Sequence, residues 1–344
     1  MDSFTEKNVA GTMEEALKMW QNGGRTLRNI KIILLFVASA SILSGCSYFN
    51  TGQIQNVGLL VDTAIDENAW SEKGYKGLSL IEERFDVQVY YKENITTEEE
   101  INEAIDEFVQ DGVNLIFGHS NMYGDYFIDI AELYPDVHFV YVNGGESSEN
   151  VTSLNFNSHA MGFFAGMVAG EMTTTNEIGV IAAFSWQSEA EGFYEGVKYQ
   201  NPNAHIRVNY TNSWTNTDIA TGIYKTMQQN GVDIVYPIGD SYSEEVIRKA
   251  AEDQNYAIGY ITDQLSIAPN TVLTSTIQHV DELYEKTAEQ FNEGKLAGEL
   301  ITLDFNDEFI TLGEFNEAIP EAFQEELHDL IKEYKETGLL PNEH

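Results

Sequence analysis

Apolar runs of four to six residues alternate with amphipathic stretches of about twelve to fifteen residues from residue 57 onward. This alternation is typical of an α/β fold, in which crossover helices connect parallel strands. The pattern predicts strands over 57–62, 87–91, 114–117, 138–142, 151–154, 178–182, 206–210, 233–236, 257–260 and 272–276. Helices are expected between them, most clearly over 97–109, where Thr97-Glu98-Glu99-Glu100 is typical of a helix start. Residues 300–305 and 309–312 are predicted to form a terminal hairpin, followed by an amphipathic helix over 320–334.

An internal repeat relates the two halves of this pattern. The same residue types recur 119 positions apart at Tyr75/Tyr194, Gly77/Gly196, Tyr91/Tyr210, Gly112/Gly231 and Tyr141/Tyr260. A period of this length fits a complete doubly wound unit, so we expect an α/β protein of two parallel-sheet lobes with a ligand cleft between them. We place lobe one at 56–150, lobe two at 151–295, and a closing hairpin and helix at 296–344, with later connections crossing back between the lobes.

Glycines recur at four-residue spacing within 158–172, at Gly162, Gly166 and Gly170. In a membrane span this spacing would favour dimerisation, but in a water-soluble domain it indicates close packing of one helix against a neighbour. We therefore expect this helix to be tightly packed.

Net charge is the most informative feature of the composition. The 344 residues carry 56 acidic and 18 basic side chains, a formal net charge of −38. Such a chain repels nucleic-acid phosphates and anionic lipid head groups, so direct nucleic-acid binding is not expected. An apolar content of 42% excludes disorder of the whole chain, and a single Cys excludes an internal disulfide framework.

The amino-terminal region predicts export. Basic residues at 25, 28 and 31 precede the apolar run 32–38, and small residues lead to Leu43-Ser44-Gly45-Cys46. We interpret 25–45 as a signal peptide and 46–55 as a tether. The four residues resemble the bacterial lipobox, which implies lipidation of Cys46 and anchoring to the outer face of the cell membrane. The alternative is a buried Cys that follows a short core helix. Residues 1–24 are expected to be a spurious or unstructured extension.

Candidate chemistry follows from the strand ends, because ligands of open parallel sheets bind beyond the carboxyl ends of strands. Aromatic faces and carboxylates at those ends favour a nucleoside-like or sugar-like small molecule over an anion. Simpler roles are open for several of them: Trp70 and Tyr242 as caps of the lobe cores, Asp66 and Asp125 as helix N-caps. The candidates are Asp62, Asp66, Trp70, Asp125, Asn143, Trp186, Gln187, Asp240, Tyr242, Asp263 and Gln264.

Catalytic signatures are missing from the sequence. It has no Gly-rich phosphate loop ending in Lys-Ser/Thr and no His-Glu-x-x-His, and Met122 occupies the second Gly position of a nucleophile elbow at 118–122. Seven scattered His offer no metal cluster. We expect no enzyme, no metal site and no cofactor.

Several stretches taken together resemble the basic membrane lipoprotein (BMP) family, from about residue 57 to residue 292. They are 57–62, 158–166, 192–198, 231–235, 259–264 and 272–275, including Val57-Gly58-Leu59-Leu60-Val61-Asp62 and Tyr260-Ile261-Thr262-Asp263-Gln264. The resemblance implies the type I periplasmic-binding-protein fold, a nucleoside-like ligand and an ABC permease as partner.

The chain departs from the purine-binding members of that family at positions that contact ligand in them. The ring-stacking Phe is Trp70 here, the base-reading Asn is Ser71, and the ribose-holding Lys is Gln278, while Asp125 matches the family's acid. The resemblance therefore adds Ser71 and Gln278 to the candidate ligand-binding residues.

Two functions from different classes follow. The first is a membrane-tethered extracytoplasmic receptor whose cleft closes on a small molecule. The second is implied by likeness to a family member described as a positive regulator of competence-gene expression. At a net charge of −38 we expect such regulation to be indirect, without DNA binding.

Overall fold

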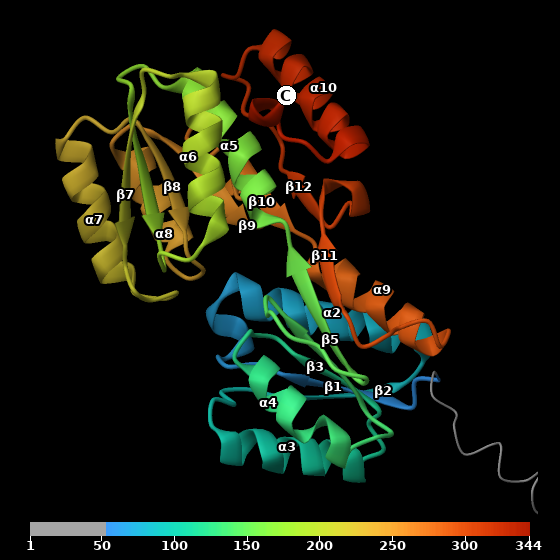
Figure 1. Cartoon of the computed structure of the whole chain (residues 1–344). Coiled ribbons are helices and arrows are strands. Elements are labelled where there is room, and N and C mark those ends of the chain that lie inside the picture. The colour runs from blue at the N-terminus through green and yellow to red at the C-terminus, as the bar shows by residue number, and fades with distance from the viewer. Residues whose placement is uncertain (1–52) are drawn as a thin grey trace, which may run out of the picture. The chain divides into compact units, whose positions relative to one another are not determined.

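Two six-stranded sheets organise residues 53–344, the part of the chain that the computed structural model describes (Figure 1). The first sheet has the order β11-β5-β4-β3-β1-β2, and the second has the order β12-β10-β9-β8-β6-β7. Every strand pairing is parallel except that of β10 with β12. The strands are β1 (Asn56–Leu60), β2 (Gln88–Lys92), β3 (Leu115–Gly118), β4 (His138–Val142), β5 (Val151–Phe156), β6 (Glu177–Ala182), β7 (His205–Tyr210), β8 (Ile234–Ile238), β9 (Tyr256–Ile261), β10 (Val272–Gln278), β11 (Leu300–Leu303) and β12 (Ile310–Leu312).

Helices cover both faces of each sheet. In lobe one, α2 and α9 pack on one face and α3 and α4 on the other; in lobe two, α5 and α6 oppose α7 and α8. The bounds are α2 (Ala69–Phe85), α3 (Glu98–Gln110), α4 (Tyr123–Ile130), α5 (Ser158–Met172), α6 (Ser188–Gln200), α7 (Thr217–Gln229), α8 (Ser243–Glu252), α9 (Val280–Asn292) and α10 (Glu321–Thr337). The predicted fold class, two doubly wound parallel-sheet lobes, is confirmed.

Local sequence explains these elements. Central strands such as β4 and β8 are buried along their whole length, as expected of parallel strands covered on both faces. The edge strands β2 and β7 are partly exposed. The predicted start of α3 is a capping box: the Thr97 hydroxyl accepts from the Glu100 N–H at 3.3 Å, and the Glu100 carboxylate accepts from the Thr97 N–H at 3.0 Å.

In both lobes, a glycine with a positive φ precedes the third strand. Gly112 and Gly231 precede β3 and β8 and have φ of 77° and 85°, a region that favours glycine because it has no Cβ.

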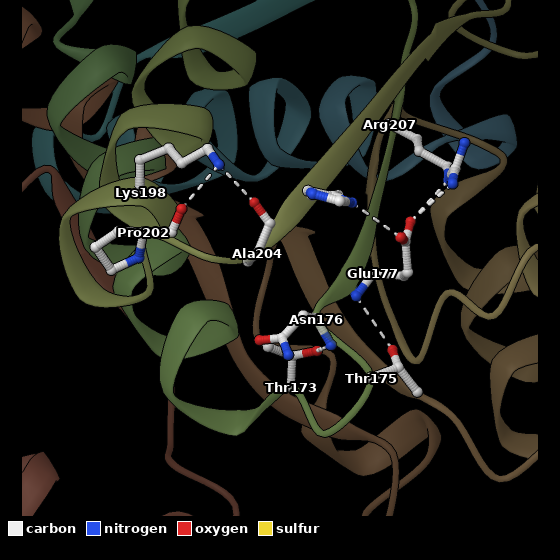
Figure 2. A network of polar contacts seen from close by, with 9 residues as sticks. Thr173, Thr175, Asn176, Glu177, Lys198, Pro202, Ala204 and Arg207 are labelled. Carbon is white, nitrogen blue, oxygen red and sulfur yellow. Dashed lines mark hydrogen bonds and ion pairs between the residues drawn. The ribbon is translucent and has the colours of Figure 1, made fainter.

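Polar contacts connect β6 to the edge strand β7 in lobe two (Figure 2). Arg207 on β7 donates from its Nε to the Glu177 Oε2 on β6 at 3.0 Å. Lys198 at the end of α6 donates to the Pro202 and Ala204 carbonyl oxygens beside it.

The lobe boundaries drawn from the sequence are wrong in two places. The division at 150/151 fails because β5 pairs with β4 in the first sheet. The helix α9, assigned to lobe two, packs on α2 of lobe one. The chain does cross back between the lobes, as expected, after β5, after β10 and between β11 and β12.

The predicted terminal hairpin is also wrong. Strand β11 runs parallel to β5 at the edge of the first sheet, whereas β12 runs antiparallel to β10 at the edge of the second. A strand satisfies its backbone hydrogen bonds at any open sheet edge in reach, and two edges were open here. The 3₁₀ turn Phe305–Asp307, capped by Asp304, lies between the two strands.

The signal peptide, Cys46 and most of the tether lie outside the described residues. Within 53–344, no helix has the length and apolar character needed to span a bilayer.

Candidate functional site

A cavity of about 240 Å³ lies between the lobes, at the carboxyl ends of the strands. The segments that follow β1, β3 and β4 and the carboxyl end of β5 line it from lobe one. The segments that follow β6, β7 and β8 and the carboxyl ends of β9 and β10 close it. This is the position expected for ligand in open parallel sheets. The lining combines tryptophans (Trp70, Trp186, Trp214), carboxyl groups (Asp62, Glu189, Asp240), amides (Asn68, Asn121, Asn143, Asn155, Gln187, Gln278) and hydroxyls such as those of Ser120, Ser158 and Tyr260.

The tryptophans form the cavity's flat surfaces. In lobe two, Trp186 stacks on Phe184 with centroids 5.5 Å apart and an interplanar angle of 8°, and Trp214 meets Trp186 edge-on at 5.7 Å. Trp186 is 60% exposed, which is unusual for so large an apolar side chain. Such a surface on a cavity wall is suited to stacking a planar ring.

His119 holds Trp70 in place through ring stacking and hydrogen bonds. Their rings stack with centroids 4.5 Å apart, and the Trp70 Nε1 donates to the His119 carbonyl oxygen at 3.2 Å. The His119 Nε2 lies 2.7 Å from the Trp70 carbonyl oxygen and therefore donates, so its Nδ1 accepts from the Tyr284 hydroxyl at 2.6 Å. Burial lowers the pKa of His119 to about 4, so the ring is neutral near pH 7.

Asp240 links the two lobes. Its Oδ1 accepts from the Trp70 N–H, in the first turn of α2, at 3.2 Å. A carboxylate at a helix N-terminus interacts favourably with the helix dipole. Burial nevertheless raises the pKa of Asp240 to about 7, and the nearby charge of Asp62 adds to this increase.

The other two cavity carboxyl groups are also perturbed by burial. Burial raises the pKa of Asp62, although a hydrogen bond with Ser120 opposes the shift. Burial likewise raises the pKa of Glu189, whose Oε1 lies 3.4 Å from the Tyr260 hydroxyl.

The cavity also contains strained backbone. Ile261 has a φ of 68°, a region that a β-branched residue rarely adopts, and the Thr262 N–H donates back to the Tyr260 carbonyl oxygen at 2.8 Å. Strain of this kind costs on the order of 1–3 kcal/mol and is concentrated at functional sites. The turn ends β9 abruptly at the cavity wall.

Seven predicted site residues line the cavity: Asp62, Trp70, Asn143, Trp186, Gln187, Asp240 and Gln278. Ser71 lies behind the wall, because its hydroxyl is 2.8 Å from that of Thr63 and its side chain is buried. Its position supports the segment that carries Trp70.

Five others lie elsewhere. Gln264 is buried, and its Oε1 accepts from the Tyr260 N–H at 3.0 Å. Asp66 and Asp125 are exposed, the former on a 3₁₀ turn and the latter in the first turn of α4. Tyr242 is fully buried in the core, with its hydroxyl 3.1 Å from the carbonyl oxygens of Ile181 and Ile238. Asp263 is exposed, because the tight turn at Ile261 directs it to the Glu314 N–H, 2.8 Å away.

Sequence reasoning missed Glu189, Trp214, Asn155 and Ser158. Trp214 follows β7 by four residues, so the strand-end rule was sufficient to find it. Asn155 lies inside β5, and its side-chain direction depends on the sheet to which β5 belongs. Glu189 is in the first turn of α6, where an acid is common for local reasons alone.

Comparisons with known proteins agree with this geometry. A family model described as ABC transporter substrate-binding protein PnrA-like matches residues 54–344. The transcriptional activator protein Med of Bacillus subtilis is 44% identical over 312 residues, which cover 90% of this chain and 98% of Med. Basic membrane protein D of Borreliella burgdorferi is 25% identical over 79% of this chain and 82% of its own length.

Solved structures give the same result. A transcriptional activator of the comK gene from Bacillus halodurans superposes with a TM-score of 0.78 at 44% identity, covering 83% of this chain and 99% of that one. An ABC transporter solute-binding protein from Conexibacter woesei superposes with a TM-score of 0.68 over 84% of this chain and 99% of its own, and at 17% identity it supports the fold alone. The expected resemblance is confirmed: the chain belongs to the Bmp family of PnrA-like ABC transporter substrate-binding proteins.

Proposed function

We propose that this protein is a receptor for a nucleoside-like small molecule, which it binds between its lobes. One observation carries the proposal: the cavity is walled by Trp70 from lobe one and by Trp186 and Trp214 from lobe two. Side-chain amides and hydroxyls surround these rings. A planar ring with hydroxylated substituents satisfies both kinds of surface.

Ligand binding would favour the closed arrangement of the lobes. The hydrogen bond from the Trp70 N–H to Asp240 joins the two lobes directly at the cavity. A ligand that contacts both walls adds further interactions that only the closed arrangement can make, so it shifts the equilibrium towards closure. A closed receptor is what an ABC permease, the partner expected for this family, would bind.

A thermal-shift screen of the purified full-length protein against nucleosides, nucleobases and small sugars tests the proposal. A ligand at one hundred times its dissociation constant stabilises the folded state by about 2.7 kcal/mol. We expect Trp186→Ala and Trp214→Ala to weaken this shift. Tyr210→Ala, at an aromatic residue that is 42% exposed on β7 outside the cavity, is the matched control. A screen without any shift, or shifts unchanged in both Trp variants, contradicts the proposal.

We further propose that lipid on Cys46 tethers the protein to the extracytoplasmic face of the cell membrane. Each buried methylene contributes about 0.8 kcal/mol, so two acyl chains give stable anchoring that the acidic chain itself does not provide. In fractionated cells the wild type should require detergent for release, and Cys46→Ser should not. Equal distribution of both forms would refute the tether.

A second function is favoured by the names of two relatives that are 44% identical, both described as transcriptional activators. We propose as the alternative a positive regulator of competence-gene expression that acts indirectly. The charge of −38 disfavours DNA binding. Loss of a competence reporter on gene deletion, without a gel shift by the purified protein, supports this alternative, and a salt-sensitive gel shift contradicts it.

A further inference from the structure

The charged groups that line the cavity are all acidic. Asp62, Glu189 and Asp240 lie on its wall, and none of its described lining residues is Lys, Arg or His. Lys73, a largely buried cation, is engaged behind the wall: its Nζ donates to the Gln278 carbonyl oxygen at 2.9 Å and lies 3.6 Å from Asp281. Among the described residues, none therefore places a positively charged side chain in this cavity.

The hydrogen bonds that these three carboxyl groups accept come from uncharged donors. Asp240 accepts from the Trp70 backbone N–H, and Asp62 interacts with the Ser120 hydroxyl. Glu189 is 7% exposed; the Tyr260 hydroxyl lies 3.4 Å from its Oε1, and the Ser158 hydroxyl also hydrogen-bonds to the carboxylate. Within residues 53–344 no ion pair involves any of the three.

Glu189 is buried, and Asp62 and Asp240 are partly buried. Carboxylates removed from water without a cationic partner are costly, and that cost is the cause of their raised pKa values. A positive charge inside the cavity would remove much of the cost. The tryptophan faces act in the same direction, because the negative face of an aromatic ring attracts a cation. An anionic ligand, such as a nucleotide phosphate, would be repelled by all three carboxylates.

We infer that the ligand of this cavity is a small organic cation, with a positively charged nitrogen among Asp62, Glu189 and Asp240 and an attached ring or apolar group against the tryptophans. The inference rests on the proposed function, since it names the class of molecule that the proposed receptor binds. A nucleoside with a cationic base meets both requirements, and so does a hydroxylated quaternary ammonium compound.

Calorimetric titration of the full-length protein with two matched pairs tests the inference. Choline and 3,3-dimethylbutanol share a shape and differ in charge, and 1-methyladenosine is the cationic counterpart of adenosine. We expect the cationic member to bind at least tenfold more tightly in one pair or both, a difference of about 1.4 kcal/mol. If the neutral member binds as tightly as its cationic counterpart, the inference is wrong although the receptor function stands. If no probe and no compound of the screen binds, both are wrong.

Isosteric variants locate the effect. Asp62→Asn, Glu189→Gln and Asp240→Asn remove charge and keep shape, and each should reduce the preference for the cationic probe severalfold. Glu191→Gln is the control, because Glu191 is exposed on the same helix as Glu189 and does not line the cavity. Trp214→Ala should weaken the binding of both the cationic and the neutral member of a pair. A preference that survives in all three carboxyl variants would refute the assignment, and the wild-type comparison decides the inference even where a variant fails to fold.

Discussion

One glycine of α5 and one glycine of α7 allow a stability test in which the same substitution has opposite effects. A Cβ added to Gly166 on α5 would lie 2.2 Å from the Phe193 carbonyl oxygen on α6. A Cβ added to Gly222 on α7 would meet nothing within 4 Å. Both residues lie inside helices, so Gly166→Ala and Gly222→Ala change backbone propensity equally and differ only in packing.

The magnitudes follow from two effects. Alanine is favoured over glycine in a helix by about 0.8–1.0 kcal/mol, so Gly222→Ala should stabilise the protein by about 0.4–1 kcal/mol. At Gly166 the same gain is outweighed, because a methyl group 2.2 Å from a rigid carbonyl forces the two helices apart. Overpacking of a core typically costs 1–3 kcal/mol, and contact with backbone is at the upper end of that range, so we expect a net loss of about 2 kcal/mol.

Urea unfolding followed by far-UV circular dichroism measures both free energies of unfolding. The slope of the free energy against urea concentration should stay constant if neither variant changes the unfolded state. A Gly166→Ala variant as stable as the wild type would refute the close backbone packing of α5 and α6. A destabilised Gly222→Ala variant would refute the propensity argument.

Two further predictions concern charged groups. The pKa of Asp240 is about 7 in the folded protein against 3.8 as its ordinary value, so the stability it contributes is fully present below about pH 4 and is lost as the pH rises through 7. Asp240→Asn should reduce that decline in a series of thermal melts, while the declines caused by Asp62 and Glu189 remain; an unchanged profile would contradict the burial argument. Asp281 pairs α9 with α2 through Lys76 at 2.6 Å and Lys73 at 3.6 Å. Asp281→Asn leaves Lys73 buried without its counter-charge and should cost about 3 kcal/mol in chemical unfolding, whereas a loss below about 0.5 kcal/mol would show that solvent screens the pair.

Short-range patterns predicted the elements well where the cause of the structure is itself short-range. The strand at 138–142 has the same bounds in the structure. The helix after Thr97 begins with the expected capping box, because both partners of that motif lie within four residues. The glycine spacing on α5 predicted tight packing, since glycines four residues apart share one helix face.

The failures have a common physical reason, which is that pairing partners are chosen over long distances. Strands β11 and β12 are close in sequence, but each pairs with an open edge of a different sheet. The same holds for β5, whose apolar pattern is equally compatible with either lobe. The pattern of a strand specifies its faces and leaves its neighbour undetermined.

The direction of each side chain likewise depends on distant contacts, and it decides which residues near the strand ends reach the cavity. That polar and aromatic residues gather beyond the strand ends follows from the topology of parallel sheets, and the sequence by itself determined this together with the fold class and the acidic charge. Only the tertiary structure decided that Tyr242 turns into the core, that the strained turn at Ile261 removes Asp263 from the cavity, and that Glu189 and Asn155 enter it. Those outcomes depend on contacts between segments far apart in the chain, which no local pattern specifies.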